Sequence, residues 1–506
     1  MKRDWTSRTM LLIVGGILVV LNLIAVNLFV RADLTDDGVY SLSDASIRLV
    51  ENLDDPVTLK AFFTDDLPAP YSSNRRFLKD KLDDYRAYGG DFIQYEFVDP
   101  VSDEAMQEEA ARFQIPPVQV QTVENDEVSV KNAYMGLGIS YGGEREVIPV
   151  VQNMETLEYD ITSAIKKLTR DRLPVVGFLS GHGEPSLAQD LSTVQQVLSR
   201  TYDVQNVTVN ATGALSVSPD VLVVMAPTDS LPQADLRAID DYIMGGGRVG
   251  FFLNRVNANL QMGQASAFGT GLEPVLESYG IRINEDLVAD EQSSAVSVQN
   301  NQGGFRFVQR IDYPLLPIAT NFSPDNIAVS RLREALFYFA STIDTSLVVD
   351  GVTVEPLIAS SERSSTQEGF FMIQPQMLQG PFVGGPFVMA AAYDGSFPSA
   401  FELGRSSVDT RLVAVGDGDW LNQSILGQLP PSNLQLALNL IDYLAQDDDL
   451  LTIRSKSIAP RQLDFVEESA RPWIKYAMML FPTLLVVAFG LVRWRVRQAQ
   501  AKIMRG

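Results

Sequence analysis

Residues 174–185 read Pro-Val-Val-Gly-Phe-Leu-Ser-Gly-His-Gly-Glu-Pro and contain the clearest structural signal in the chain. Val175 to Leu179 is a short apolar run, which is typical of a strand buried on both faces. Ser180 to Glu184 contains two glycines and predicts a turn. Pro185 suits a first helical turn, and apolar residues follow it at helical spacing. This order of strand, turn and helix predicts an α/β domain.

The same alternation of strands and helices continues after residue 198. Runs of β-branched residues alternate with amphipathic stretches, which is typical of a parallel, doubly wound sheet of the Rossmann or flavodoxin-like kind. We expect this domain to comprise residues 152–290 and 387–450, interrupted by a β-rich subdomain at 291–386, where polar and Gly-rich stretches separate short strands. The further strands and helices expected are Asp203–Val209, Val221–Met225, Pro232–Met244, Arg248–Leu253, Arg411–Val415 and Leu434–Leu444.

A smaller α/β domain is expected at residues 31–151. Val57–Phe63 and Phe92–Val98 read as strands, and Asn74–Tyr88 between them reads as a helix, so the three form a βαβ unit. Four further strands are expected at Val118–Val123, Val128–Val130, Met135–Tyr141 and Glu146–Val151. A thioredoxin-like unit is one expectation for this small α/β domain. The chain has no cysteine, which excludes dithiol redox chemistry.

Two apolar runs near the ends predict one transmembrane helix each. Residues 10–30 contain no charge and are long enough to span a hydrocarbon layer, and residues 476–492 lie between Trp473 and Trp494. The alternative for the first run is a cleaved signal peptide, which would have a shorter apolar core. Asn22 and Asn27 inside this run are candidates for contacts with neighbouring membrane helices.

Lysine and arginine flank the two runs on their outer sides, at residues 1–9 and in the basic tail 493–506. Positive flanks predict that both termini are cytoplasmic. The expected protein is therefore a two-pass protein of the bacterial inner membrane whose main body is extracytoplasmic, joined to the second span by a stalk at residues 451–475.

Composition excludes several classes of function. The 506 residues carry a formal net charge of −23, which disfavours nucleic acid as a partner because phosphate binding needs clustered Lys and Arg. No Gly-Lys dipeptide occurs, so there is no phosphate-binding loop of the Gly-x-x-x-x-Gly-Lys-Ser/Thr type. ATP chemistry therefore has to come from another chain, and we expect no cofactor.

Polar turns follow several of the expected strands and gather at one edge of the sheet, where doubly wound domains bind ligands. The candidate rim residues are Ser180, His182, Glu184, Asp417 and Asp419. They either line a ligand pocket, or cap helices and tie loops together as such side chains commonly do. His182 is the single histidine, and neither a serine–histidine–acid arrangement nor a three-ligand metal site is evident from spacing. We therefore assign no catalytic, cofactor or metal residue.

The pentapeptide at 180–184, the turn Gly416 to Asn422, the run Asn439 to Leu444 and the two terminal anchors resemble the GldG-type family of ABC-transporter auxiliary proteins. Family members are associated with an ABC permease and an ABC ATPase, and some serve gliding motility. The resemblance also implies an extracytoplasmic domain like that of an intraflagellar-transport protein, with a sheet related to class I amidotransferase-like folds.

The leading functional hypothesis is a non-enzymatic, membrane-anchored auxiliary subunit of an ABC-type transport complex, with the permease, the ATPase and the lipid bilayer as partners. The first alternative is a membrane-anchored hydrolase or amidotransferase-like enzyme, for which Ser180 is the candidate nucleophile. The second is an extracytoplasmic module that binds sugars or peptides.

Overall fold

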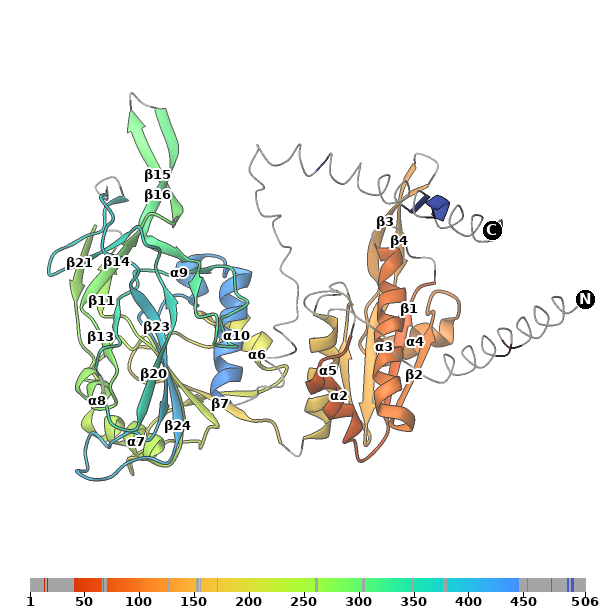
Figure 1. Ribbon diagram of the computed structural model, residues 1–506, viewed down its shortest axis with the longest axis horizontal. Coiled ribbons are helices and arrows are strands. Elements are labelled where there is room, and N and C mark those ends of the chain that lie inside the picture. Colours follow the sequence, from red (N-terminus) through yellow and green to blue (C-terminus); the bar gives the residue numbers. More distant parts are fainter. Residues whose placement is uncertain are drawn as a thin grey trace, which may run out of the picture. The chain divides into compact units, whose positions relative to one another are not determined.

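The computed structural model describes residues 41–445 with short gaps, and a few isolated residues beyond that range. The chain divides into two compact units, Met1–Ser457 and Ile458–Gly506, and every element below belongs to the first. Figure 1 shows the elements with their labels. The gaps are residues 66, 68–70, 125–126, 152–153, 155, 171, 260–262, 303–304, 348, 376–377 and 379, and the isolated residues are 13, 16, 453, 475, 489, 490 and 493–495.

The N-terminal region, residues 44–169, is built on a four-stranded sheet in the order β2-β1-β5-β6. β1 pairs in parallel with β2, while β5 is antiparallel to both β1 and β6. A separate hairpin joins β3 to β4. The elements are α2 (Asp44–Glu51), β1 (Val57–Phe63), α3 (Asn74–Gly89), β2 (Ile93–Val98), α4 (Glu104–Arg112), β3 (Val118–Glu124), β4 (Glu127–Ala133), β5 (Met135–Tyr141), β6 (Glu144–Ile148) and α5 (Leu157–Thr169).

The main region, residues 173–445, is built on an eight-stranded sheet in the order β17-β20-β23-β24-β10-β9-β7-β8. The five strands from β24 to β8 are parallel, and β23, β20 and β17 continue the sheet in antiparallel pairings. These strands are β7 (Val175–Leu179), β8 (Asp203–Val207), β9 (Val221–Met225), β10 (Arg248–Phe252), β17 (Asn321–Phe322), β20 (Val352–Ala359), β23 (Val388–Gly395) and β24 (Thr410–Val415).

Helices cover both faces of this sheet. Alternate residues of a strand point to opposite faces, so Val221 and Val223 pack with α6 and α10, whereas Leu222 and Val224 pack with α7 and α8. The two hydrophobic cores that result hold the sheet between helical layers. The helices are α6 (Ser192–Leu198), α7 (Gln233–Met244), α8 (Glu273–Ser278), α9 (Gln423–Leu426) and α10 (Pro431–Leu444).

Smaller sheets lie between β10 and β23 along the chain, and one of them includes a long hairpin of β15 and β16 that extends beyond its neighbours in Figure 1. The strands are β11 (Val256–Asn259), β12 (Gln264–Ala267), β13 (Arg282–Ile283), β14 (Asp286–Asp290), β15 (Ser293–Gln302), β16 (Phe305–Ala319), β18 (Ala335–Leu336), β19 (Ile343–Asp344), β21 (Ser364–Glu368) and β22 (Phe371–Met372).

The predicted fold class needs two corrections. The architecture is mixed α/β with many sheets, and the main sheet is not purely parallel, because three antiparallel strands extend it. Two of these strands, β17 and β20, come from the segment 291–386, which was expected to form a separate subdomain. Buried antiparallel strands such as β23 show the same continuous apolar pattern as parallel ones, so the sequence pattern does not report strand direction.

The second correction concerns the transmembrane helix expected at each end. Among the residues that the structure describes, no helix is both long enough and apolar enough to cross a membrane. The two runs on which that expectation rested, 10–30 and 476–492, lie outside the described residues except for a few isolated positions, as do Asn22 and Asn27.

Candidate functional site

The carboxyl ends of the parallel strands of the main sheet carry the polar turns singled out in the sequence. The first turn follows β7. Ser180 donates its backbone N–H to the carbonyl oxygen of Val207 at 2.9 Å, and its hydroxyl lies 3.4 Å from the same oxygen. The Ser180 side chain therefore faces the end of β8.

His182 is 6% exposed, and both of its ring nitrogens have an acidic partner. Nδ1 lies 3.1 Å from Oε1 of Glu184, and Nε2 lies 2.8 Å from Oδ2 of Asp235 in the first turn of α7. The second carboxylate oxygen of Glu184 accepts the backbone N–H of His182 at 2.6 Å. The imidazole thus joins the turn after β7 to a helix more than 50 residues further along the chain.

The glycines of this turn allow a close approach between backbones. A Cβ atom on Gly183 would lie 2.0 Å from Oγ1 of Thr228, and Gly183 has a φ of +79°. Thr228 and Asp229 both donate their backbone N–H groups to the carbonyl oxygen of His182 at 2.9 Å. Glycine is therefore required where the ends of β7 and β9 meet.

The second turn follows β24 and is centred on Asp417, whose side chain is fully buried. Its Oδ2 accepts the backbone N–H of Tyr338 at 2.5 Å, and its Oδ1 accepts that of Asp419 at 2.7 Å. Burial, and then the neighbouring Asp419 carboxylate, raise the pKa of Asp417 well above its usual range, although hydrogen bonds from the backbone oppose this. Asp417 thus fastens the segment around residue 338 to the end of β24.

Asn254, which follows β10, bridges two residues of the same turn. Its amide nitrogen donates to Oδ2 of Asp419 at 2.8 Å, and its amide oxygen accepts the backbone N–H of Gly418 at 2.7 Å. Burial raises the pKa of Asp419 to about 6, and the hydrogen bond from Asn254 partly offsets that rise. The ends of β10 and β24 are joined through this amide.

Two glycines of the second turn have no room for a side chain. A Cβ on Gly416 would lie 2.1 Å from the carbonyl oxygen of Ser341, and one on Gly418 would lie 2.6 Å from the Cβ of Ala226. Ala226 has a φ of +43°, which is unusual for a residue other than glycine. The backbone at the centre of the carboxyl edge is therefore held under local strain by dense packing.

Arg255 occupies the neighbouring position and is 8% exposed. Nη1 contacts Glu273 at 2.6 Å and the carbonyl oxygen of Phe268 at 2.8 Å, while Nη2 contacts Glu285 at 2.5 Å. A cavity of about 50 Å³ lies beside it, lined also by Asn254 and Arg282. This cavity is too small for more than a water or two.

The structure places most of the predicted rim residues in two hydrogen-bonded clusters. His182 and Glu184 belong to the first cluster together with Asp235, and Asp417 and Asp419 belong to the second, whereas Ser180 is bonded to Val207 and joins neither cluster. Asp235, the partner of His182, was not among the predicted rim residues, although acidic side chains are favoured in the first turn of a helix. Tyr338 was not predicted either, since a backbone N–H donor leaves no signal in the sequence.

This arrangement disfavours hydrolysis by Ser180. The Ser180 hydroxyl is directed at a carbonyl oxygen, and both nitrogens of His182 are engaged by carboxylates, so the imidazole has no free nitrogen to act as a base toward Ser180. Among the described residues, no group of three or more His, Cys, Asp or Glu side chains is placed to hold a metal ion.

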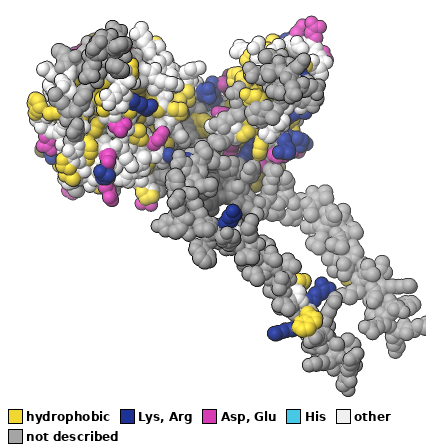
Figure 2. All heavy atoms as spheres, turned by 90° about the horizontal axis from the view of Figure 1, so that it is seen from above, with side chains coloured by type: hydrophobic (Ala, Val, Ile, Leu, Met, Phe, Trp, Pro, Cys, Tyr) yellow, Lys and Arg dark blue, Asp and Glu magenta, His cyan; other side chains and the backbone are white. Residues whose placement is uncertain are grey.

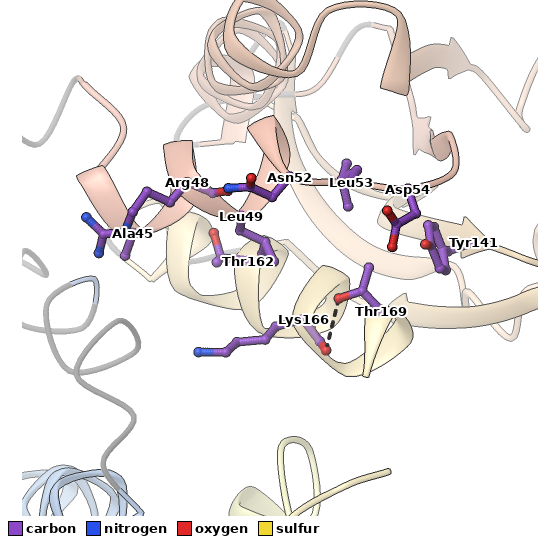
Figure 3. Close-up of a pocket in the computed structure, with 10 residues that line it drawn as sticks. All are labelled: Ala45, Arg48, Leu49, Asn52, Leu53, Asp54, Tyr141, Thr162, Lys166 and Thr169. Atoms are coloured by element: carbon purple, nitrogen blue, oxygen red, sulfur yellow. Dashed lines mark hydrogen bonds between the residues drawn. The ribbon is translucent and has the colours of Figure 1, made fainter. Parts of the chain in front are cut away.

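A larger opening lies in the N-terminal region, between α2 and α5 (Figure 3). Its volume is about 340 Å³. Arg48 and Lys166 come from the two facing helices, while Asp54 and Tyr141 lie toward the other end. Thr169 donates its hydroxyl to the carbonyl oxygen of Lys166 at 3.3 Å, which caps the end of α5. The groove is polar and open, and it combines charges of both signs.

The chain resembles known families and proteins over most of its length. A model of the family described as ABC-type uncharacterized transport system matches residues 173–446, and one described as a domain of unknown function matches residues 36–140. A protein of Borreliella burgdorferi named only as uncharacterized is 22% identical over 414 residues, which cover 76% of this chain and 78% of that protein.

Two solved structures are distantly similar. The mmIFT52 N-terminal domain shares 13% identity at a TM-score of 0.35 and covers 57% of this chain and 100% of that domain. A putative ThuA-like protein from Parabacteroides merdae shares 12% identity at a TM-score of 0.29 and covers 55% of this chain and 91% of that protein. Because both TM-scores are below 0.5, the fold is assigned from the order of the strands in this chain's own sheets.

Proposed function

Because the chain belongs to the family described as ABC-type uncharacterized transport system, we propose that it is an auxiliary subunit of an ABC-type transport complex. In this proposal an ABC permease provides the pathway and an ABC ATPase provides the energy, while the present chain binds them and catalyses no reaction. The observation that carries the proposal is the family match, which spans the whole main region.

The geometry of the carboxyl edge supports a role in assembly. The side chains that would bind a ligand in a doubly wound domain already have hydrogen-bond partners within the protein. His182 contacts two acids, Asp417 accepts from backbone N–H groups, and Asn254 donates to Asp419. Such a network stabilises loops and gives the surface a fixed shape. A fixed surface suits a protein that docks onto others.

The charge of the chain supports protein partners and not nucleic acid. On the face shown in Figure 2, acidic and basic side chains of the described residues are interspersed among hydrophobic and uncharged ones. Nucleic-acid surfaces instead cluster Lys and Arg. The narrower assignment to the GldG-type branch is also a proposal, supported by the sequence at residues 180–184 and 416–422.

Co-purification tests the proposal. The full chain, tagged and isolated from its native cells in mild detergent, should bring down one polytopic permease and one ATPase in fixed ratio. A tagged membrane protein of unrelated function is the control. Recovery of the chain alone, under conditions in which another ABC assembly of the same cells stays intact, would refute the proposal.

A second measurement separates this proposal from the hydrolase alternative. We expect no ester, amide or glycan turnover that depends on Ser180, because its hydroxyl is paired with a carbonyl oxygen and not with His182. Screening the purified chain beside its Ser180→Ala variant tests this. Turnover by the parent that the variant lacks would favour the enzyme.

A further inference from the structure

Ile453 packs against the N-terminal region, although it follows the last helix of the main region. It is 2% exposed and forms a small hydrophobic cluster with Ala45 of α2, against which Tyr159 of α5 also packs. It belongs to the same compact unit as these two helices. The chain that leaves the main region after Ala445 therefore reaches the N-terminal region by Ile453.

This contact lies at one end of the groove between α2 and α5. Ala45, the partner of Ile453, also lines that groove, whose volume is about 340 Å³. Figure 3 shows Ala45 and Arg48 at one end, with the side-chain nitrogen of Lys166 directed toward the same end, and Asp54 toward the other. The half of the groove nearest to Ile453 is therefore cationic.

The sequence that precedes Ile453 is complementary in charge to this half of the groove. Residues 447–449 are three consecutive aspartates, and two leucines follow them. After Ile453 the chain carries Arg454 and Lys456 instead. Opposite charges attract and like charges repel, so the electrostatics favour the preceding segment as the occupant and disfavour the following one.

The length of the segment also fits the groove. An extended chain covers at most about 3.3–3.6 Å per residue, so Asp449 can lie as far as about 13 Å from Ile453. A helix rises about 1.5 Å per residue, so Lys166 lies only about 10 Å along α5 from Tyr159. The aspartates can therefore reach the cationic half of the groove while Ile453 stays in its hydrophobic cluster.

We propose that the groove between α2 and α5 is the docking site of the chain's own segment 447–453, with the three aspartates beside Arg48 and Lys166. Residues 446–452 lie outside the described part of the chain. Docking gives the main region a second connection to the N-terminal region, besides the linker that joins α5 to β7. The inference concerns the fold of one chain, so it goes beyond the proposed role in a transport complex and holds or fails independently of it.

Introduced cysteines test the placement, because the chain contains no cysteine. Asn52→Cys puts one thiol in the groove, and Leu450→Cys puts a second thiol three residues before Ile453. A short bismaleimide should link the two thiols within one chain, at a yield that does not depend on protein concentration. The matched control combines Asn52→Cys with Ser457→Cys, four residues after Ile453, and should give about fivefold less linked peptide in mass spectrometry.

Two results of this experiment would overturn the proposal. Equal yields from the two cysteine pairs would show that the segment before Ile453 is not held in the groove. Links that form only between two chains, and that increase with protein concentration, would show that a second copy occupies the groove.

A charge reversal tests the pairing. Arg48→Glu, added to the pair Asn52→Cys/Leu450→Cys, sets a carboxylate against the aspartates and should lower the yield within one chain about fivefold. Adding Asp448→Lys restores an opposite-charge pair and should return the yield to within about twofold of the starting value. Arg363→Glu, at an exposed arginine of the main region, is the control and should change nothing. A yield that Arg48→Glu leaves unchanged, or that Asp448→Lys does not restore, would contradict the docking.

Discussion

The imidazole of His182 lies 2.8 Å from the carboxylate of Asp235, so that one side chain links the end of β7 to the start of α7. Glu184 holds the other ring nitrogen from within the same turn. The histidine that looked like a ligand candidate in the sequence is therefore the centre of a buried contact between two elements of the main sheet region.

Replacing His182 with alanine should lower the free energy of unfolding by roughly 1–3 kcal/mol. The substitution leaves Glu184 and Asp235 without their ring partner in a largely buried site, and an unsatisfied buried polar group costs about that much. Urea unfolding followed by circular dichroism measures the loss. Ser180→Ala is the control, because the 3.4 Å contact that it removes is weak.

The folded fraction of His182→Ala should still assemble with its partners. A variant of parental stability that assembles fully yet has no cellular function would show instead that the histidine serves a ligand.

Strand positions were largely predictable from the sequence. The predicted strands Val57–Phe63, Met135–Tyr141, Val175–Leu179 and Val221–Met225 are confirmed residue for residue. Val175–Leu179 and Val221–Met225 are continuous apolar runs, and burial on both faces produces that pattern, whereas Val57–Phe63 carries Thr58 and Lys60 between its apolar residues.

Long-range contacts and some helix boundaries could not be predicted. The helix expected from Pro185 begins only at Ser192, since Glu184 is engaged with His182 and residues up to Leu191 form turns. The partners of Asp417 and His182 are distant along the chain, and their pairing depends on the sheet order. Local patterns carry no information on which distant loops meet.

The two acids of the second turn should make the protein more stable in mild acid. Burial raises the folded-state pKa of Asp419 to about 6, above the ordinary value of 3.8 that applies when unfolded. A raised pKa means that the contribution to stability is full below pH 3.8 and is lost as the pH rises through 6. The melting temperature should therefore rise as the pH is lowered from 7.5 to 5.5.

Asp419→Asn isolates this effect, because asparagine keeps a carbonyl oxygen for the amide of Asn254 and has no charge to bury. The variant should be more stable than the parent at pH 7.5, by roughly 1–3 kcal/mol, and the difference should shrink at pH 5.5. Calorimetry of both proteins across that range measures it. A difference that stays constant with pH would contradict the assignment.

Gly418→Ala should destabilise the main region by about 1–3 kcal/mol. The new methyl group would lie 2.6 Å from the Cβ of Ala226 and 2.9 Å from the carbonyl oxygen of Phe252, so backbone atoms have to move. Gly245→Ala is the matched control, because its φ is −75° and its nearest neighbour would lie at an ordinary 3.4 Å. Denaturation midpoints report both, and equal midpoints for the two variants would show that the turn has room to relax.

Arg255 and Arg282 line the same small cavity but should differ sharply when replaced by alanine. Arg255 is buried and contacts Glu273, Glu285 and two carbonyl oxygens, so its removal leaves buried acceptors unpaired. Broken buried pairs cost about 3–5 kcal/mol, and we expect roughly 2–4 here because Glu285 remains in water. The side chain of Arg282 is 41% exposed, and its ion pairs should contribute about 0–1 kcal/mol.

Urea unfolding at low and high salt measures how much unfolding free energy each alanine variant loses. Only the loss for Arg282→Ala should decrease at high salt, because salt screens exposed ion pairs. Similar losses for the two arginines would mean that burial does not set the strength of this cluster.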